Sequence, residues 1–286
     1  MLRGARRRPG AGADGLRNGL RTDTGQSGKM TMTIPGSDPD NPDEVRVQIV
    51  ALRQLDADGN TLGAGGSAKH SFNSFATQEF TFGAPQAATY QGLSTQEIEF
   101  ESVLVGNSNL NIKTMIFQEA GNLTVGDDTF AVAPGAIKFN VELGTWSWCG
   151  DAGVSCVNAD GAGAAVELDI DMYRMGSEPQ TKADDADSTT SESYDLGNGQ
   201  ELVLLSTYSD TDGSTWTQMP SGFPSLDGST FTLKFPRWTS SKVIYDPIIA
   251  YGGDDALQLS DSSSSTRAAA GGLGVALAFL HAFGLA

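Results

Sequence analysis

Histidine is nearly absent from this chain of 286 residues, which contains only His70 and His281. This scarcity restricts nucleophilic catalysis, because Ser-His-Asp and Cys-His sites use an imidazole as the general base. His281 lies in a C-terminal segment that we expect to be removed, so such a site would have to be built on His70. No nucleophile elbow accompanies His70, and we interpret it as an ordinary residue at the edge of a strand. The sequence also lacks a Gly-Lys-Ser/Thr phosphate loop and a dinucleotide-binding fingerprint.

Basic residues are few: Lys and Arg number 18 against 35 Asp and Glu, which gives a formal net charge of −17. Residues 1–30 hold seven of the basic and two of the acidic residues, so the remainder has 11 basic and 33 acidic residues and a net charge of −22. Such a body repels a phosphate backbone, so we expect no nucleic-acid partner, the basic leader being the one segment that could supply such binding. Cations, basic proteins and neutral glycans stay open as partners. So does the simpler interpretation that the carboxylates only keep the protein soluble.

No apolar run reaches the roughly 20 residues that a membrane-spanning helix needs. The longest candidate is the C-terminal tail, residues 273–286. It follows a Ser/Gly-rich linker, residues 256–272, and this order is typical of a signal for a glycosylphosphatidylinositol (GPI) anchor. We therefore expect cleavage near Ser260, Ser262 and Ser263, and a membrane attachment through lipid at the cell surface. A buried C-terminal helix of a soluble domain is the alternative.

The N-terminal end shows no export signal. A secretory signal needs a basic start followed by about 7–15 apolar residues, whereas residues 1–30 are rich in Arg and contain no apolar run. We expect translation to start further upstream, with a signal segment that this sequence does not include. An organelle transit peptide, which is also Arg-rich and poor in acids, is the alternative. We expect residues 1–42 to be a disordered leader, first basic and then rich in Pro and Asp.

The hydrophobic period of the central region is two, which is typical of half-buried β-strands. Apolar and polar residues alternate over 137–143, 166–172 and 231–235. Further strands are expected at 45–55, 72–82, 98–105, 110–118, 129–132, 202–208 and 242–245, most of them bounded by Gly, Asn, Asp or Pro.

This pattern predicts an all-β fold in which residues 43–255 form one two-sheet antiparallel sandwich. Jelly-roll-like and Ig-like topologies both fit, and the sequence does not decide between them. Residues 176–199 are polar and irregular, so we expect a long mobile excursion between strands there.

The two cysteines, Cys149 and Cys156, are separated by six residues that include two glycines. This spacing favours a disulfide in an oxidising compartment, which would stabilise the fold by roughly 2–3 kcal/mol. Two buried free thiols are the alternative. A zinc site would need both cysteines to converge with His70, without the usual spacing of zinc ligands.

A single glycosylation sequon, Asn122-Leu123-Thr124, lies in a stretch that we expect to be a turn. A glycan on Asn122 would be accommodated at such a site. The protein is therefore expected to be a glycoprotein.

Three segments carry a resemblance to known proteins: the run from Phe139 to Cys149, the run from Phe231 to Trp238, and the run from Tyr245 to Gly252 ahead of the Ser-rich linker and apolar tail. Together they resemble a group of eukaryotic surface β-domains that includes sequences found in skeletal or extracellular matrices. The resemblance covers roughly residues 43–255. It implies an extracellular location, and it transfers no defined activity.

One cluster of acids is a candidate for catalysis. Glu167, Asp169 and Asp171 share one face of a strand, because side chains two apart point the same way. The pattern resembles the Glu-x-Asp-x-Glu signature of jelly-roll glycoside hydrolases, in which the first Glu is the nucleophile and the last is the acid/base. Here Asp171 is one methylene shorter than that acid/base. The alternative is an acidic, solvated strand face. Four tryptophans are candidates for stacking on sugars or for the core: Trp146, Trp148, Trp216 and Trp238.

Calcium is another use for the acids. Asp56 and Asp58 begin a segment that resembles a calcium loop, yet its twelfth position is Ser67 instead of Glu. A second Asp-rich segment, residues 210–214, has no better support, and Asp-Gly hairpin turns explain both. We expect no cofactor, apart from weak, roughly millimolar calcium binding by surface carboxylates.

The sequence thus favours an acidic module for recognition, adhesion or structure at the cell surface or in the extracellular matrix, without catalysis. A glycoside hydrolase or carbohydrate-binding protein that uses Glu167, Asp169 and Asp171 is the alternative.

Overall fold

The computed structural model describes the following residues: 22–25, 29–33, 44–64, 69–75, 78–104, 108–125, 128–157, 161–174, 180–181, 191–197, 200–210, 213, 215–246 and 248–250. Within these ranges the secondary structure is entirely β, and every strand pair is antiparallel. The all-β fold class is therefore confirmed. The GPI-type tail, the cleavage region with Ser260, Ser262 and Ser263, and His281 lie outside the described residues.

The first large sheet has seven strands. Its main path runs β1 (Thr22–Gly25), β2 (Lys29–Thr33), β3 (Glu44–Leu55), β12 (Ala165–Arg174), β19 (Thr230–Pro236) and β18 (Ser225–Asp227), and β4 (Thr61–Leu62) pairs with β3. We call this the β12 sheet.

The second large sheet has ten strands. Its main path runs β13 (Gln180–Thr181), β14 (Ser191–Gly197), β15 (Gln200–Leu205), β21 (Ile248–Ala250), β11 (Ile137–Gly144), β8 (Asn109–Phe117), β7 (Leu93–Val103) and β5 (Thr81–Phe82). Two more strands join it: β20 (Lys242–Tyr245) pairs with β11, and β6 (Gln86–Tyr90) pairs with β7. We call this the β11 sheet.

Two hairpins complete the described strands: β9 (Gly121–Val125) with β10 (Asp128–Val132), and β16 (Thr207–Tyr208) with β17 (Thr217–Gln218). The β9–β10 hairpin is tied to the turn between β6 and β7, because the Gln91 side chain bonds both the backbone N–H and the carbonyl of Thr124. Gln91 itself has a positive φ of 48° and precedes Gly92, as a two-residue hairpin turn requires.

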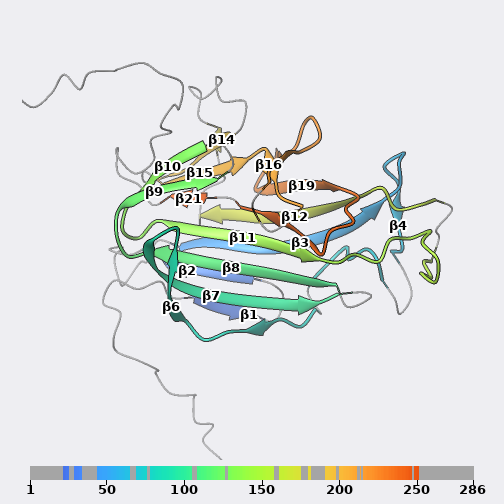
Figure 1. The fold of residues 1–286 in the computed structure, drawn as a ribbon, viewed down its shortest axis with the longest axis horizontal. Helices are drawn as coiled ribbons and strands as arrows, with labels where there is room; N and C mark the ends of the chain where they lie inside the picture. The colour runs from blue at the N-terminus through green and yellow to red at the C-terminus, as the bar shows by residue number, and fades with distance from the viewer. Residues whose placement is uncertain are drawn as a thin grey trace, which may run out of the picture.

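The two large sheets pack face to face, with β7, β8 and β11 lying over β1, β2 and β3 in Figure 1. Aromatic rings join the layers: Tyr194 of the β11 sheet lies 5.3 Å from Phe231 of the β12 sheet, and Tyr245 lies 6.4 Å from Phe235. Edge-to-face contacts of this kind add to the apolar burial that drives sheet packing. The predicted two-sheet sandwich is confirmed.

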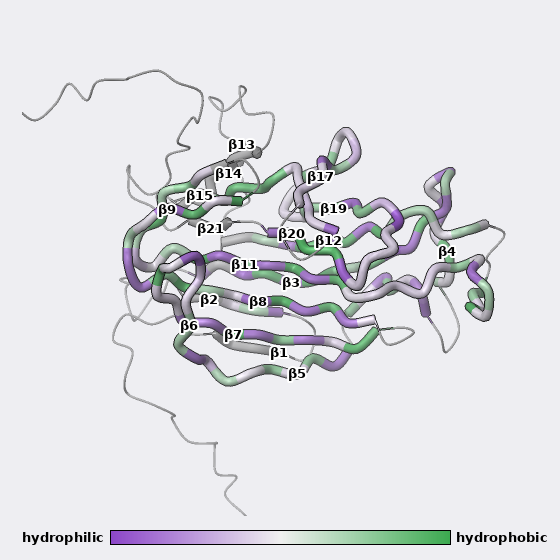
Figure 2. Tube along the Cα trace, viewed as in Figure 1, coloured by the Kyte–Doolittle hydropathy of each residue, from purple (hydrophilic) through white to green (hydrophobic). Residues whose placement is uncertain are grey.

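Polar and apolar residues alternate along the strands, as the colours of β7 and β11 in Figure 2 show. The buried apolar residues of the two large sheets form one core cluster. In β12 the apolar residues Val166, Leu168 and Ile170 are buried, whereas the residues between them face outward. Strand β3 keeps its apolar residues inside by means of a bulge. Ala51 pairs with Asp169 and Ile49 pairs with Ile170, so Val50 between them has no partner residue on β12 and forms the bulge. The bulge inverts the alternation, because a one-residue shift exchanges the two faces of a strand.

Three expectations about the strands need correction. No strand covers 72–82: Phe72 forms an isolated bridge with Leu52, and β5 contains only Thr81 and Phe82. The expected excursion 176–199 contains β14, whose residues 191–197 pair with β15. The expected leader contains β1 and β2, and Met30 of β2 is buried against the core.

The apolar residues of 72–82 do not alternate regularly, and the alternating stretch in β2 is only five residues long, so tertiary packing decided these conformations. In the part of the chain that the structure describes, no helix has the length and apolar character needed to cross a membrane.

Candidate functional site

The three acids on β12 lie on the outer face of the β12 sheet, between β3 and β19. The register places Glu167 between Arg53 and Lys234, Asp169 beside Thr232, and Asp171 beside Thr230. The bulge at Val50 is what turns Arg53 outward, because without it the odd residues of β3 would continue to face the core. The sequence thus predicted the shared face correctly, and the structure adds its basic partners. We call this group the β12 ion network.

Direct bonds join the members of the β12 ion network. Arg53 donates two hydrogen bonds to Asp169, at 2.6 and 2.8 Å, in the bidentate arrangement that is the strongest for this pair. Lys234 Nζ lies 3.1 Å from Glu167 Oε1, and Arg53 lies 3.6 Å from the other oxygen of Glu167. The Thr232 hydroxyl donates to Asp169 at 2.9 Å, and the Thr230 hydroxyl donates to Asp171.

The charges in the β12 ion network support one another. Partial burial alone would lower the pKa of Arg53, but the hydrogen bond and the charge of Asp169 outweigh it, so this pKa lies above its ordinary value. The Glu167 and Asp169 side chains keep only 16% and 12% of their accessible surface. This face is therefore less solvated than expected, and its carboxylates are already occupied by bonds within the protein.

The tryptophans do not surround the β12 ion network. Trp146, Trp148 and Trp238 are buried, and the Trp238 ring centre lies 6.2 Å from that of Trp146 and 5.0 Å from that of Trp148. Trp216 is only partly buried and packs against the core. The interpretation of the three buried tryptophans as core residues is therefore the one that the structure favours over sugar stacking.

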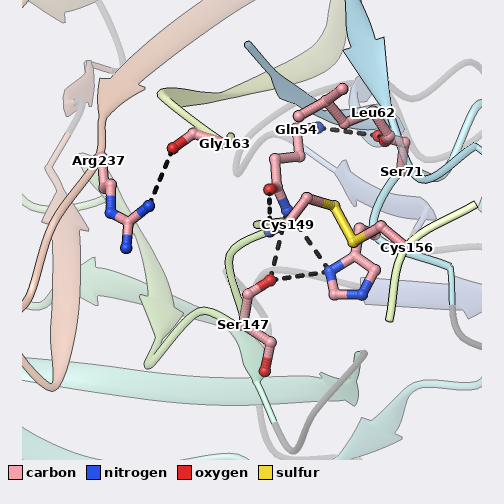
Figure 3. Close-up of a disulfide and its surroundings, with 9 residues drawn as sticks. Gln54, Leu62, Ser71, Ser147, Cys149, Cys156, Gly163 and Arg237 are labelled. Atoms are coloured by element: carbon pink, nitrogen blue, oxygen red, sulfur yellow. Dashed lines mark hydrogen bonds between the residues drawn. A yellow bond between two sulfur atoms is a disulfide. The ribbon is translucent and has the colours of Figure 1, made fainter. Parts of the chain in front are cut away.

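The disulfide lies at one end of the sandwich, in a polar cluster (Figure 3). Cys149 and Cys156 are bonded to each other, and Cys149 is completely buried. Gln54, which the bulge turns inward, accepts a hydrogen bond from the Cys149 backbone N–H at 2.7 Å. The Gln54 backbone N–H donates to the Ser71 hydroxyl, which in turn donates to the Leu62 carbonyl at 2.6 Å. The cluster therefore ties the disulfide loop to β3 and β4.

Glycine is required where the chain passes the disulfide. A Cβ atom on Gly163 would lie 2.1 Å from the Gln54 amide oxygen and 2.8 Å from the Trp148 ring, so both of these buried groups would have to shift to admit a side chain. The Gly163 N–H bonds the Cys149 carbonyl, and its own carbonyl accepts a bond from Arg237 at 3.3 Å (Figure 3). The two glycines inside the loop, Gly150 and Gly153, have φ values of 89° and 81°.

His70 belongs to this cluster and is buried, so it differs from the strand-edge residue that we expected. Its Nδ1 lies 2.8 Å from the Ser147 carbonyl oxygen, which can only accept, so Nδ1 carries the proton. The ligand atoms of His70, Cys149 and Cys156 lie within 4.8 Å of one another. The three residues thus converge as a zinc site would need, but the two sulfurs are bonded to each other and are not available as thiolate ligands.

The calcium candidates Asp56 and Asp58 lie in the turn after β3. One oxygen of Asp56 accepts the backbone N–H groups of Asp58 and Asn60, at 2.9 and 2.8 Å, and the other accepts the Asn60 side chain. These bonds, chiefly those from Asn60, lower the pKa of Asp56. The carboxylate therefore closes its own turn, which agrees with the interpretation as an Asp-Gly turn.

The sequon lies in strand β9 and not in the turn that we expected. Asn122 and Thr124 are exposed, and Leu123 between them is buried. Asn122 therefore points to solvent, where a glycan has room.

The outer face of the β11 sheet carries a second row of charges, which the sequence alone did not single out. Lys113 pairs with Glu97 at 3.4 Å, and Lys242 pairs with Glu142 at 2.9 Å. At the far end of this row Lys138 pairs with Asp246, and both are buried. Lys138 occupies a polar position in an alternating strand. The sequence therefore predicted that it faces solvent together with the other polar residues of that strand, Asn140 and Glu142.

Comparison with known proteins gives one result for the sequence and one for the fold. No solved structure matches the chain. A family of extracellular type does match: the model of the acidic skeletal organic matrix proteins covers residues 35–192 and 177–283, which is most of the chain. The acidic composition agrees with that description, and the chain belongs to the acidic skeletal organic matrix protein family.

Proposed function

We propose that this protein is a non-catalytic structural module of an extracellular skeletal matrix, with a recognition or adhesion role at the cell surface. The observation that carries the proposal is the occupation of the candidate catalytic acids. Glu167 and Asp169 are held by Arg53 and Lys234, and Asp171 by Thr230. A retaining hydrolase needs one free nucleophilic carboxylate and one protonated partner above a bound sugar. The family to which the chain belongs supports the same conclusion.

Attachment to the membrane by a GPI lipid is part of this proposal. It rests on the order of the C-terminal segments: a Ser-rich stretch with Ser260, Ser262 and Ser263, a short spacer and an apolar tail. Cells that express the full transcript should display the protein and release it on treatment with phosphatidylinositol-specific phospholipase C. Detection of residues 273–286 in the mature polypeptide would contradict the anchor but not the matrix role.

The enzymatic alternative is tested with sugars. Purified protein, incubated with β-glucans and sulfated galactans, should release no reducing ends. A Glu167→Gln variant serves as the matched control, since loss of a nucleophile abolishes cleavage but leaves sugar binding. Reducing ends that are produced by the wild type and not by Glu167→Gln would overturn the proposal.

Exposed carboxylates should make cations and basic proteins the natural partners of this module. We expect calcium binding to be diffuse and roughly millimolar, as is typical of extracellular sites. Calorimetric titration should show no loss of binding in Asp58→Asn, because the Asp58 side chain is exposed and is one of many acids. A saturable micromolar site that this substitution removes would show instead a built calcium loop.

A further inference from the structure

The buried pair on the β11 sheet combines two groups that are rarely taken out of water together. The side chain of Lys138 has no accessible surface, and that of Asp246 has 3%. Lys138 Nζ contacts Asp246 Oδ1 and donates a hydrogen bond to Asn140 Oδ1 at 2.9 Å. The Tyr90 ring covers Nζ with its centre 5.2 Å away, and the Tyr90 hydroxyl donates to Asp246 Oδ2 at 3.3 Å.

Neighbouring strands fix the position of Asp246. Strand β20 ends at Tyr245, which pairs with Val141, and β21 begins at Ile248, which pairs with Lys138. Asp246 thus lies in the two-residue interruption between two strands that both pair with β11. Its side chain has little freedom, and the reacting groups are held together before any reaction begins.

Burial decides the charge of the amine. Removal from water lowers the pKa of Lys138 well below its ordinary value. A neutral amine and a neutral carboxylic acid cost less to bury than an ammonium and a carboxylate, so the shared proton is best placed on the acid. A neutral amine is also the nucleophilic form of lysine.

We propose that Lys138 and Asp246 join in an intramolecular isopeptide bond. The lone pair of Lys138 Nζ attacks Cγ of Asp246, a C–N bond forms, and the C–Oδ1 bond breaks. One proton passes from Nζ to the departing hydroxyl, and one water leaves. No oxidant, reductant or cofactor takes part, because the atoms of a carboxylic acid and an amine balance those of an amide and water.

The two neighbours assign the two oxygens of Asp246. Tyr90 bonds Oδ2, so Oδ2 is the oxygen on which negative charge develops and is stabilised, in the manner of an oxyanion hole. Burial raises the pKa of Tyr90, which keeps its hydroxyl protonated as a donor. Oδ1, which contacts Nζ, is the oxygen that leaves. Asn140 orients the amine by accepting one of its hydrogens.

The product fits the site better than the charged pair. Its carbonyl oxygen keeps the hydrogen bond from Tyr90, and its N–H keeps the bond to Asn140. Every polar atom of the new amide is therefore satisfied, and no buried charge remains.

Peptide mapping of the mature protein, purified from cells that express the full transcript, tests the bond. After reduction, alkylation and trypsin digestion, the peptide 114–174 should be found uncut at Lys138 and linked to the peptide that begins at Val243, with a mass one water below the sum of the two. Cleavage after Lys242 is the internal control, since Lys242 and its partner Glu142 lie on the same face but keep contact with water. Cleavage after Lys138 together with a free peptide starting at Val243 would overturn the proposal.

Variants test the mechanism without requiring the pair to be destroyed. Asp246→Asn should give the same linked peptide, because ammonia then leaves in place of water. Tyr90→Phe should lower the linked fraction at early times in a pulse-chase at least several-fold. An unchanged rate in Tyr90→Phe would overturn the role of Tyr90, whereas a linked peptide that persists in Lys138→Met would show that the bond involves another residue.

Discussion

Two lysine–carboxylate pairs join β11 to the same C-terminal segment, and they differ mainly in their contact with water. In the first, Glu142 of β11 pairs with Lys242 of β20, with 23% and 35% of the side-chain surfaces accessible. In the second, Lys138 of β11 pairs with Asp246, with 0% and 3% accessible. The members of the two pairs lie four residues apart in the sequence, Lys138 from Glu142 and Lys242 from Asp246. Along the outer face of the β11 sheet, the side chains are therefore accessible to water at the Glu142–Lys242 pair and buried at the Lys138–Asp246 pair.

The comparison shows that burial changes the chemistry of a pair, and not only its strength. In water, Glu142 and Lys242 gain little from their attraction, since screening and side-chain entropy nearly offset it. Away from water, the cost of two charges favours their neutral forms, which can react with each other. The β12 ion network lies between these cases, because it is partly covered and its central carboxylate, Asp169, accepts hydrogen bonds from both Arg53 and Thr232.

The largest effect is expected at the buried end. Lys138→Met should lower the free energy of unfolding by about 4–5 kcal/mol, since it leaves Asp246 buried without its partner and removes a link that would close a loop of roughly 100 residues. Equilibrium unfolding in guanidinium chloride provides the measurement. The double variant Lys138→Met/Asp246→Leu should recover part of the loss, because it removes both polar groups. A loss below about 1 kcal/mol in Lys138→Met would mean that burial adds nothing to this pair.

The disulfide ranks next, because it closes a much shorter loop. Cys149→Ser should cost about 2–3 kcal/mol, the scale expected for a loop of this size. Both cysteines should resist alkylation in the native protein until a reductant is added. Labelling of both thiols without reduction would contradict the bond, and Cys156→Ser is the matched variant that should give the same loss.

The β12 ion network should show an intermediate effect. Asp169→Asn should cost about 1–2 kcal/mol, since it removes the acceptor of a partly buried bidentate arginine. Asp171→Asn should cost less, about 0.5–1 kcal/mol, because Asp171 has a single bond to Thr230. Thermal unfolding of the two variants side by side measures the difference. Equal losses would show that the bidentate bond to Arg53 contributes no more than one hydroxyl.

The smallest change in stability is expected at the water-accessible pair, Lys242 and Glu142. Lys242→Met should change the free energy of unfolding by no more than about 0.5 kcal/mol, and the change should shrink further at high salt. Denaturant unfolding at low and high ionic strength measures it. If Lys242→Met lowered the free energy of unfolding by more than about 2 kcal/mol at every salt concentration, the Lys242–Glu142 pair would behave like the buried Lys138–Asp246 pair. The difference in burial would then not explain the difference between the two pairs.

Sequence reasoning predicted the sandwich because its strongest signal, alternation along β11, β12 and β19, is set by burial on one face of each strand. It also predicted the disulfide and the shared face of Glu167, Asp169 and Asp171, because both depend only on the spacing of residues that are close in the sequence. It did not predict the arginine partner of Asp169. Arg53 faces outward only because β3 contains a bulge at Val50. The buried apolar residues change phase there, from Val47 and Ile49 to Leu52, but one regular strand was predicted over 45–55.

Lys138 was beyond prediction on different grounds. Its place in an alternating strand is that of a solvated residue, and what covers it comes from elsewhere in the chain, from Tyr90 of β6 and from Asp246 after β20. Strand β14 was similarly missed, because it has only two apolar residues, Tyr194 and Leu196, which is too short an alternation to predict a strand. Contacts between distant segments depend on the whole fold, so they cannot be predicted from the residue pattern of one strand.

The interruption between β20 and β21 also determines how the molecule would respond to tension. A pull on the chain beyond Ala250 would first peel the three residues of β21 away from β11 and β15, one ladder bond after another. The peeling would then reach Asp246, where a covalent tie would pass the force directly to β11, which is flanked by β8 and β20 within the sheet. A protein held at its C-terminal end in a stiff matrix would in this way yield by a few residues and then stop.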